Sequence, residues 1–251
     1  MAAITAAMVK ELREMTDAGM MECKKALVEA DGDMDKAVDV LRTRGLAAAA
    51  KKVGRATNEG TVMAIVSDDA TKGAVVELNC ETDFVGMNEK FKAYAEKIAK
   101  AALAAKPADV DALKAAVIDG ETVEEIVTDC IHVMGENTQL ARVAVVDAQA
   151  VSAYIHGGGK IGVMVRAESP AGAIPEILAA AKDCALQVAA MNPPYLKRED
   201  VPAAVLDEEK KIILAQMAED PKMANKPEQV KEKIAAGKVG KYYGENCLLE
   251  Q

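Results

Sequence analysis

The stretch Gly73-Ala-Val-Val-Glu-Leu-Asn-Cys-Glu-Thr-Asp-Phe-Val85 says most about the fold and function of this chain. An apolar run rich in β-forming residues ends in a small polar cluster, after which Asp83 and Phe84 follow in direct succession. The chain has only two phenylalanines and no tryptophan, so an aromatic residue at a strand end is informative. Either Asp83 and Phe84 project from the strand end as a wedge into another protein, or Phe84 is a core residue that closes a hairpin.

Two segments resemble signatures of one protein family. The run Glu77-Leu-Asn-Cys-Glu-Thr-Asp-Phe-Val85 is similar to the second signature of elongation factor Ts, the bacterial nucleotide exchange factor for elongation factor Tu. The run from Leu12 to Leu27 resembles the first signature of the same family. The resemblance covers nearly the whole chain, and it implies a factor that acts by binding, without catalysis of its own and without a cofactor.

The resemblance implies a function and three sets of contact residues. The family binds elongation factor Tu with GDP bound, disturbs its Mg²⁺ and phosphate site, and so promotes GDP release and GTP binding. Losing Mg²⁺ removes much of the nucleotide affinity, because the ion bridges phosphate charge to protein. The implied residues are Thr82, Asp83, Phe84 and Val85 in the wedge, Leu12, Met20, Met21 and Lys24 in an N-terminal module, and Tyr154 and His156 in the core.

The chain departs from the family pattern in two places. Gly86-Met87 stands where the family usually has a small residue followed by a basic or polar one, which affects the local loop geometry and any contact of that side chain. Family members normally continue past the position of Gln251 with a further strand and a C-terminal helical module. We therefore expect the second core unit to lack a strand and to expose an apolar edge.

Composition limits the function classes. Of 251 residues, 51% are hydrophobic but only 3% aromatic, which favours helices packed through small side chains. The net charge of −9 argues against direct nucleic-acid binding. The five cysteines include no CxxC pair or metal-ligand spacing, and their odd number and the lack of a secretory signal indicate reduced thiols. Without an apolar run of about 20 residues, we expect a cytoplasmic protein that does not enter a membrane.

The predicted fold class is α+β, with a three-helix bundle of the ubiquitin-associated type, a duplicated core of small antiparallel sheets with helices, and a helical-hairpin arm. Each of two predicted strand hairpins, 60–66 with 74–78 and 151–155 with 161–165, precedes a helix. The predicted domains are 1–44 (three-helix partner-docking module), 45–58 (partly helical linker), 59–147 (core subdomain N), 148–191 (first part of core subdomain C), 192–237 (helical-hairpin arm of the dimerisation type, related to a coiled coil) and 238–251 (return to a truncated core subdomain C).

Local patterns give further expectations. Thr5 is a candidate cap for the first helix. The later predictions are helices at about 88–105, 109–118, 121–134 and 172–191, a strand at 142–146, two antiparallel helices between 205 and 236 around the proline-containing turn 220–227, and no clear last element in 242–251. The arm could mediate a homodimer or a 2:2 complex, pack on its own core, or contact the partner.

Other interpretations stay open at this point. The module at 1–44 could act alone as a binding scaffold without exchange activity, in which case it would carry all partner affinity. An enzyme using Cys80, Asp83 and His156 is a third hypothesis, weakened by the lack of a nucleophile, metal or cofactor pattern. Met20 and Met21 could pack inside the bundle, and His156 could be an exposed residue with a local hydrogen bond. The glycines after His156 lack the spacing of a phosphate-binding loop.

Overall fold

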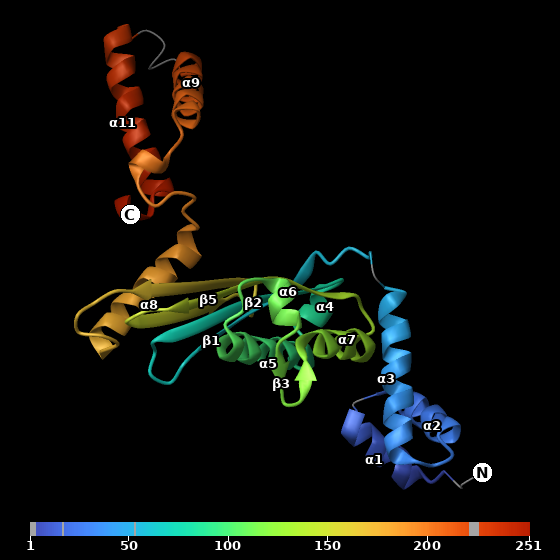
Figure 1. The fold of residues 1–251 in the computed structure, drawn as a ribbon. Helices are drawn as coiled ribbons and strands as arrows, with labels where there is room; N and C mark the ends of the chain where they lie inside the picture. Colours follow the sequence, from blue (N-terminus) through green and yellow to red (C-terminus); the bar gives the residue numbers. More distant parts are fainter. Residues whose placement is uncertain (1–3, 17, 53, 221–225) are drawn as a thin grey trace. The chain divides into compact units, whose positions relative to one another are not determined.

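The computed structural model describes residues 4–16, 18–52, 54–220 and 226–251 (Figure 1). Its fold is mixed α+β, with N-terminal helices and small antiparallel sheets, which confirms the predicted class. The chain forms two compact units, Met1–Ala185 and Leu186–Gln251. Our finer division into domains stays a prediction.

The N-terminal bundle consists of α1 (Ala6–Thr16), α2 (Met20–Glu29) and α3 (Met34–Ala50). Thr5 caps α1 as predicted, since its hydroxyl accepts a hydrogen bond from the Met8 amide at 3.3 Å. Asp33 likewise caps α3 by accepting from the Lys36 amide. The three helices bury a small apolar core made of Val9, Leu12, Ala18, Cys23, Ala26, Leu27, Ala30, Ala37 and Leu41.

Helix α3 is longer than predicted, because it continues to Ala50 through the first part of the expected linker. We predicted residues 45–58 as a partly helical linker, and its alanine-rich first part is helical because alanine has the highest helix propensity. Gly45 lies inside this helix, where a Cβ would be 3.5 Å from the Cβ of His132 in α7 (Val123–Met134). That distance is an ordinary van der Waals contact, so α3 and α7 lie side by side here with room for a methyl group.

The central sheet is antiparallel, with the order β1 (Glu59–Val66), β2 (Lys72–Cys80) and β5 (Thr138–Asp147). It contains the first predicted hairpin and extends the predicted strand at 142–146. Alternate residues of β2 face α5 (Glu89–Ala105) and α7, and this layer forms the main core. Fully buried members are Ala74, Leu78, Cys80, Phe91, Ala95, Ile98, Ala99, Ala102, Leu113, Val123 and Cys130.

A small hairpin interrupts the region where we predicted two helices. Helix α6 (Val110–Lys114) is shorter than expected, and β3 (Val117–Ile118) pairs with β4 (Glu121–Thr122). Asp119 and Gly120 connect the two strands with φ values of 53° and 84°. An Asp-Gly pair suits a turn with two positive φ angles, and we missed this signal because the apolar spacing around it fits a helix.

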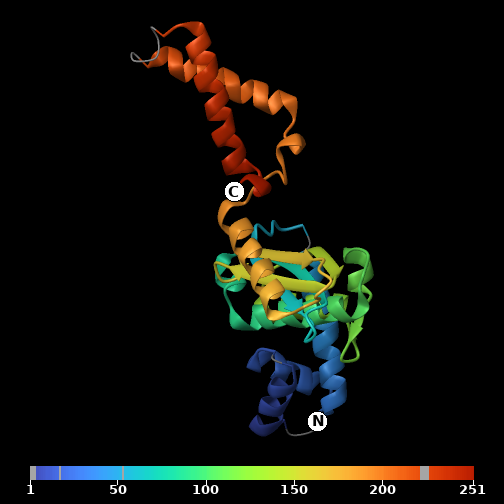
Figure 2. The ribbon, with the colours of Figure 1, turned by 90° about the vertical axis from the view of Figure 1, so that its left-hand side faces the viewer.

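The second predicted hairpin, β6 (Ala150–His156) with β7 (Ile161–Ala167), packs on the other face of the central sheet. Two glycines permit the contact: a side chain at Gly162 would clash with Val62, and a Cβ at Gly73 would lie 2.7 Å from the Met164 sulfur. The second predicted helix, α8 (Pro175–Met191), follows and crosses the hairpin in Figure 2. Both predicted hairpin–helix units are therefore present.

The second unit contains α9 (Ala203–Glu219) and α11 (Glu228–Asn246), which pack as the predicted antiparallel helices. Their shared core is Ile213, Met217, Ala235 and Val239. Of the predicted turn at 220–227, residues 221–225 lie outside the described residues. Among the helices that the structure describes, none is both long and apolar enough to cross a membrane.

The prediction of no clear element at the chain end was wrong. Helix α11 continues to Asn246, and a short 3₁₀ helix, η2 (Leu248–Glu250), follows. The backbones of Cys247 and Tyr195 form an isolated parallel β-bridge. The guanidinium carbon of Arg198 lies over the Tyr243 ring, 5.1 Å from its centre. These contacts come from the segment before α9, including the 3₁₀ helix η1 (Arg198–Asp200), so local sequence patterns could not reveal them.

The turn between β1 and β2 gives the first testable prediction. Hydrogen bonds from the Ser67 hydroxyl (2.6 Å) and from Thr71 lower the pKa of Asp69 from 3.8 to about 2. A carboxylate with a lowered pKa stabilises the fold above its unfolded pKa, and this contribution fades as the pH falls toward 2. We expect Asp69→Asn to lower the unfolding temperature by a few degrees at pH 7 and by progressively less between pH 4 and 2. A gap that stays constant over that range in thermal unfolding would contradict this.

Candidate functional site

The Asp83-Phe84 pair lies in α4 (Asp83–Gly86), a single helical turn directly after β2. Thr82 caps this turn by accepting a hydrogen bond from the Val85 amide at 3.4 Å. The Phe84 side chain is 80% exposed, whereas Val85 packs against the main core. The interpretation of Phe84 as a core residue is therefore wrong. The Phe84 ring is thus exposed to solvent, while the packing of Val85 in the core fixes the backbone that carries it.

Gly86 seats this turn on the first strand of the sheet. A Cβ at Gly86 would lie 2.9 Å from the carbonyl oxygen of Gly60 in β1, so any side chain would push the two backbones apart. Gly60 has a φ of 150°, and a side chain there would collide with the Leu78 carbonyl. The Gly86-Met87 departure thus has a physical account. Gly86 is required by the close approach, while Met87 is 53% exposed beside the turn.

Glu136 holds the backbone just before the turn. This residue follows α7 at the start of β5, and its carboxylate accepts hydrogen bonds from the amides of Glu81 (3.1 Å) and Thr82 (2.9 Å). Sequence reasoning missed Glu136, because it is 54 residues away from Thr82 along the chain. The glycine before it, Gly135, ends α7 with a φ of 76°, which marks a helix end but gives no indication of this contact.

Tyr154 and His156 lie at the end of β6, and their side chains contact each other. The Tyr154 hydroxyl and the His156 Nδ1 are 2.9 Å apart, and the Lys182 ammonium lies 4.7 Å from the centre of the Tyr154 ring. His156 is exposed, as its residue context alone suggested. Its ring has a local hydrogen-bond partner and an open surface.

The first residues of β1 connect the two turns. Gly60 contacts Gly86 of α4, while the neighbouring Glu59 forms an ion pair with Lys160 in the turn after His156. The Val62 amide also donates to the Gly159 carbonyl at 2.7 Å. The structure therefore brings the wedge residues and the 156–160 turn to the same end of β1.

The predicted N-terminal contact residues differ in exposure. Met20 and Met21 are 56% and 63% exposed, so the interpretation that both pack inside the bundle is wrong. Lys24 is exposed too. Leu12, in contrast, is completely buried between the helices, because it lies on the inward face of α1. It has no surface with which to contact a partner and instead holds the bundle together.

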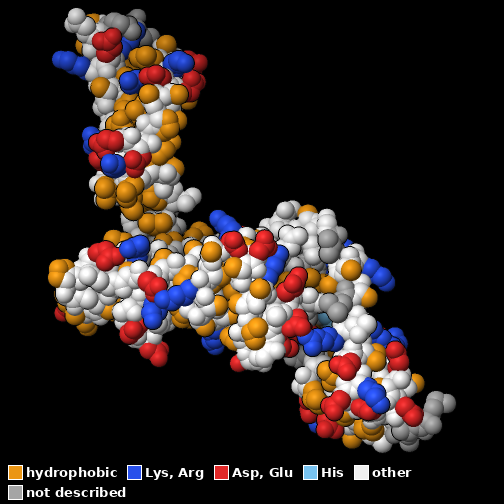
Figure 3. Space-filling model, in the orientation of Figure 1, with side chains coloured by type: hydrophobic (Ala, Val, Ile, Leu, Met, Phe, Trp, Pro, Cys, Tyr) orange, Lys and Arg blue, Asp and Glu red, His pale blue; other side chains and the backbone are white. Residues whose placement is uncertain are grey.

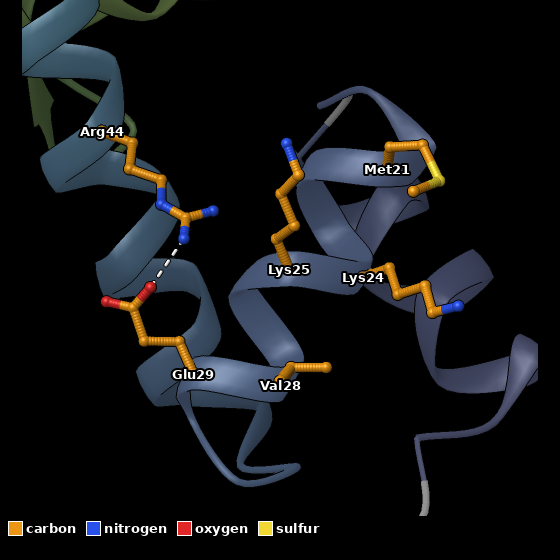
Figure 4. A pocket seen from close by; sticks show the side chains of 6 residues that line it. All are labelled: Met21, Lys24, Lys25, Val28, Glu29 and Arg44. Carbon is orange, nitrogen blue, oxygen red and sulfur yellow. Dashed lines mark hydrogen bonds and ion pairs between the residues drawn. The ribbon is translucent and has the colours of Figure 1, made fainter.

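The exposed residues of α2 form a mixed apolar and basic surface, which we call the α2 patch: Met20, Met21, Lys24 and Val28. Figure 4 shows Met21, Lys24, Lys25 and Val28 along α2, together with the ion pair between Glu29 and Arg44 at 2.6 Å. That ion pair ties α2 to α3. The α2 patch belongs to the three-helix bundle, and the wedge belongs to the sheet end.

The hypothesis of an enzyme using Cys80 finds no support in the chemistry of that residue. Cys80 is fully buried, and its thiol lies 3.1 Å from the Thr82 carbonyl. Burial, with a smaller effect of the Glu136 charge, raises its pKa to about 11. A thiol with that pKa is protonated at neutral pH and is a poor nucleophile. Asp83 on α4 and His156 on β6 are both exposed, whereas the Cys80 thiol is buried in the core. The three side chains therefore do not face a common surface.

Comparison with known proteins shows to which class and family of proteins the chain belongs. A family model described as "Elongation factor TS" matches residues 81–251. Proteins named elongation factor Ts from Syntrophotalea carbinolica, Clostridium botulinum and Clostridium perfringens are each 47% identical, over 99% of this chain and 81% of their own length. These matches assign the chain to the translation elongation factors. Within that class, it belongs to the elongation factor Ts family.

Proposed function

We propose that this protein is a guanine nucleotide exchange factor for elongation factor Tu. It binds the GDP-bound partner, inserts the turn 82–85 near the Mg²⁺ and phosphate site, and promotes GDP release so that GTP can bind. The observation that carries this proposal is the 80% exposure of Phe84 on a braced turn. A large aromatic side chain held in solvent is typical of an anchor for a protein partner.

The proposed mechanism is one of linked binding. A factor that binds the nucleotide-free partner more tightly than the GDP-bound partner must weaken GDP binding by the same factor. Equal affinity for both states would shift nothing. In this mechanism Phe84 makes its contacts best when the groups that hold Mg²⁺ have moved. The chain contributes binding energy, and no bond is made or broken.

The proposed function is tested by measuring the release of a fluorescent GDP analogue from elongation factor Tu at increasing concentrations of this protein. We expect the release rate to rise and saturate, and to be unaffected by an equal concentration of an unrelated acidic protein. Binding without any acceleration would instead support a scaffold without exchange activity. That alternative has one observation in its favour, the exposed α2 patch.

We propose that the α2 patch docks on the nucleotide-binding domain of the partner, with Tyr154 and His156 making a further contact. Exchanging Met21 for alanine is expected to raise the half-saturating concentration of the factor about tenfold, since an interface side chain of this kind contributes on the order of 1–2 kcal/mol. The maximal release rate should change little, because the wedge is intact. Met15→Ala is the matched control, as Met15 is 58% exposed on α1 and outside the α2 patch. Equal effects of both variants would contradict the docking role.

The arm formed by α9 and α11 is proposed to mediate a homodimer or a 2:2 complex. Its exposed apolar side chains include Ile212, Leu214 and Val230, and Figure 3 shows hydrophobic atoms gathered along this arm. Size-exclusion chromatography with and without elongation factor Tu distinguishes these assemblies from a 1:1 complex. The proposal also places the protein in the cytoplasm, with no direct contact to nucleic acid.

A further inference from the structure

We propose that Glu136 is a positioning residue for nucleotide exchange, and that it acts by fixing the turn that carries Phe84. The inference rests on the proposed exchange function for its consequence, but its structural part concerns this chain alone. Glu136 comes from the junction of α7 and β5, and its carboxylate is hydrogen-bonded to Glu81 and Thr82. Its effect on Phe84 therefore passes through the backbone at Glu81 and Thr82 and through the Thr82 hydroxyl.

The carboxylate of Glu136 accepts three hydrogen bonds with its two oxygens. Oε2 accepts from the consecutive amides of Glu81 (3.1 Å) and Thr82 (2.9 Å), and Oε1 accepts from the Thr82 hydroxyl (2.7 Å). Hydrogen bonds to an ionised acceptor are roughly twice as strong as those between neutral groups. This set fixes both the backbone and the side chain of Thr82.

The Thr82 hydroxyl transmits this constraint to α4. Since an ionised carboxylate can only accept, the hydroxyl hydrogen must point at Glu136. The oxygen then offers its lone pairs to the Val85 amide at 3.4 Å, which is the cap of α4. Glu136 thus sets the orientation of the group that begins the turn. A four-residue helix has little stability of its own, so its order depends on such outside contacts.

A second set of contacts closes the same junction from the other side. Oε1 of Glu81 accepts from the Asn137 amide at 2.7 Å, and the Asn137 side chain donates to the Arg55 carbonyl at 2.8 Å. The Asn137 amide is the main cause that lowers the pKa of Glu81, with a further contribution from Arg55. Neighbouring residues of the two segments therefore hold each other reciprocally, Glu136 by the amides of Glu81 and Thr82, and Glu81 by the amide of Asn137.

This arrangement has a consequence for exchange. A turn that is ordered before binding loses less conformational entropy when Phe84 enters the partner. Removing Glu136 would leave Phe84 exposed but its backbone free to move, so the turn would have to become ordered as Phe84 enters the partner. The α2 patch would be unaffected. The maximal release rate should therefore fall while the half-saturating concentration changes little.

The functional test compares Glu136→Ala, Glu136→Gln and the control Glu168→Ala, which removes an exposed carboxylate paired with Arg166 at 2.7 Å. We expect the maximal GDP release rate to fall on the order of tenfold for Glu136→Ala, less for Glu136→Gln, and not for the control. Glutamine keeps one oxygen for the two amides but presents N–H groups to the Thr82 hydroxyl. In a Phe84→Ala background, Glu136→Ala should cause no further loss.

A second test needs no partner. Amide hydrogen exchange by NMR should be faster at Glu81 and Thr82 in Glu136→Ala, with core amides unchanged. The chain has no tryptophan, so a single fluorophore introduced by Phe84→Trp reports on the turn, and Glu136→Ala should lower its fluorescence anisotropy. Glu136→Gln serves both measurements if the alanine variant unfolds.

The outcomes separate this inference from the proposed function. Unchanged amide exchange and anisotropy, or additive losses in the Phe84→Ala background, would overturn the positioning role. If even the unaltered protein fails to accelerate GDP release, the exchange function fails, and the amide measurements still decide whether Glu136 fixes the turn. Faster local exchange together with a reduced maximal rate supports the proposal.

Discussion

Replacing Phe84 with alanine is expected to lower the maximal rate of GDP release from elongation factor Tu on the order of 30-fold, with no change in the unfolding temperature. A central aromatic anchor typically contributes about 2 kcal/mol or more to a protein interface, which corresponds to that factor. The fold should be unaffected, because the ring is 80% exposed and contributes little to the core. Stopped-flow release of a fluorescent GDP analogue at saturating factor measures the rate, and thermal unfolding checks the fold.

The matched control for this experiment is Met87→Ala. Met87 is also an exposed apolar residue, and it follows α4 directly, but its side chain lies outside the proposed wedge. It should reduce the rate by no more than a few-fold, since most interface residues contribute little. A Phe84→Ala protein that releases GDP as fast as the unaltered protein would remove the basis of the wedge mechanism.

Replacing the other phenylalanine, Phe91, is expected to have the opposite pattern. Phe91 is fully buried at the start of α5, where it packs against the central sheet. Truncating a buried phenylalanine to alanine usually costs about 3–5 kcal/mol, because apolar contacts are lost and a cavity remains. Such a loss is a large fraction of the stability of most domains. Urea unfolding followed by circular dichroism measures it.

On the same helix, Glu96→Ala provides the comparison for Phe91→Ala. Glu96 forms an exposed ion pair with Lys100 one turn later, and such pairs contribute only about 0.3–0.5 kcal/mol. Phe91→Ala protein that remains folded should still accelerate GDP release, since the contact of Gly86 with Gly60 and the hydrogen bonds of Glu136 do not involve the ring. A stability loss no larger than that of Glu96→Ala would show that Phe91 does not support the core.

The parts of the fold that were predictable are those in which neighbouring residues carry the pattern. The two strand hairpins have alternating apolar residues and polar turns, and the arm has apolar spacing on both sides of a proline-containing turn. The single-turn helix α4 and the hairpin around 119–120 were not predicted. Each is specified by only two or three residues, and the apolar spacing of the longer segments around them indicates other elements. Gly45 was predicted to begin the partly helical linker, whereas it lies inside α3.

The candidate site was predictable only in part. The family signature pointed to Phe84, but the residues alone could not decide between a core and a surface position, because exposure depends on the neighbouring Val85 filling the core instead. Leu12 was included by its place in a signature, although its position on the inward face of α1 buries it. Glu136 and Asn137 could not be found at all, since their contacts with the turn join segments more than 50 residues apart.

The glycine pair at positions 60 and 86 bears on how this family can diversify. Gly86 of α4 lies directly against the main-chain atoms of Gly60 in β1. This contact therefore does not depend on which side chains α4 exposes to solvent. Substitutions at 83, 84 and 87 can therefore alter the displayed chemistry without moving the backbone that displays it. Recognition of a changed partner could evolve through these three surface positions while both glycines stay fixed.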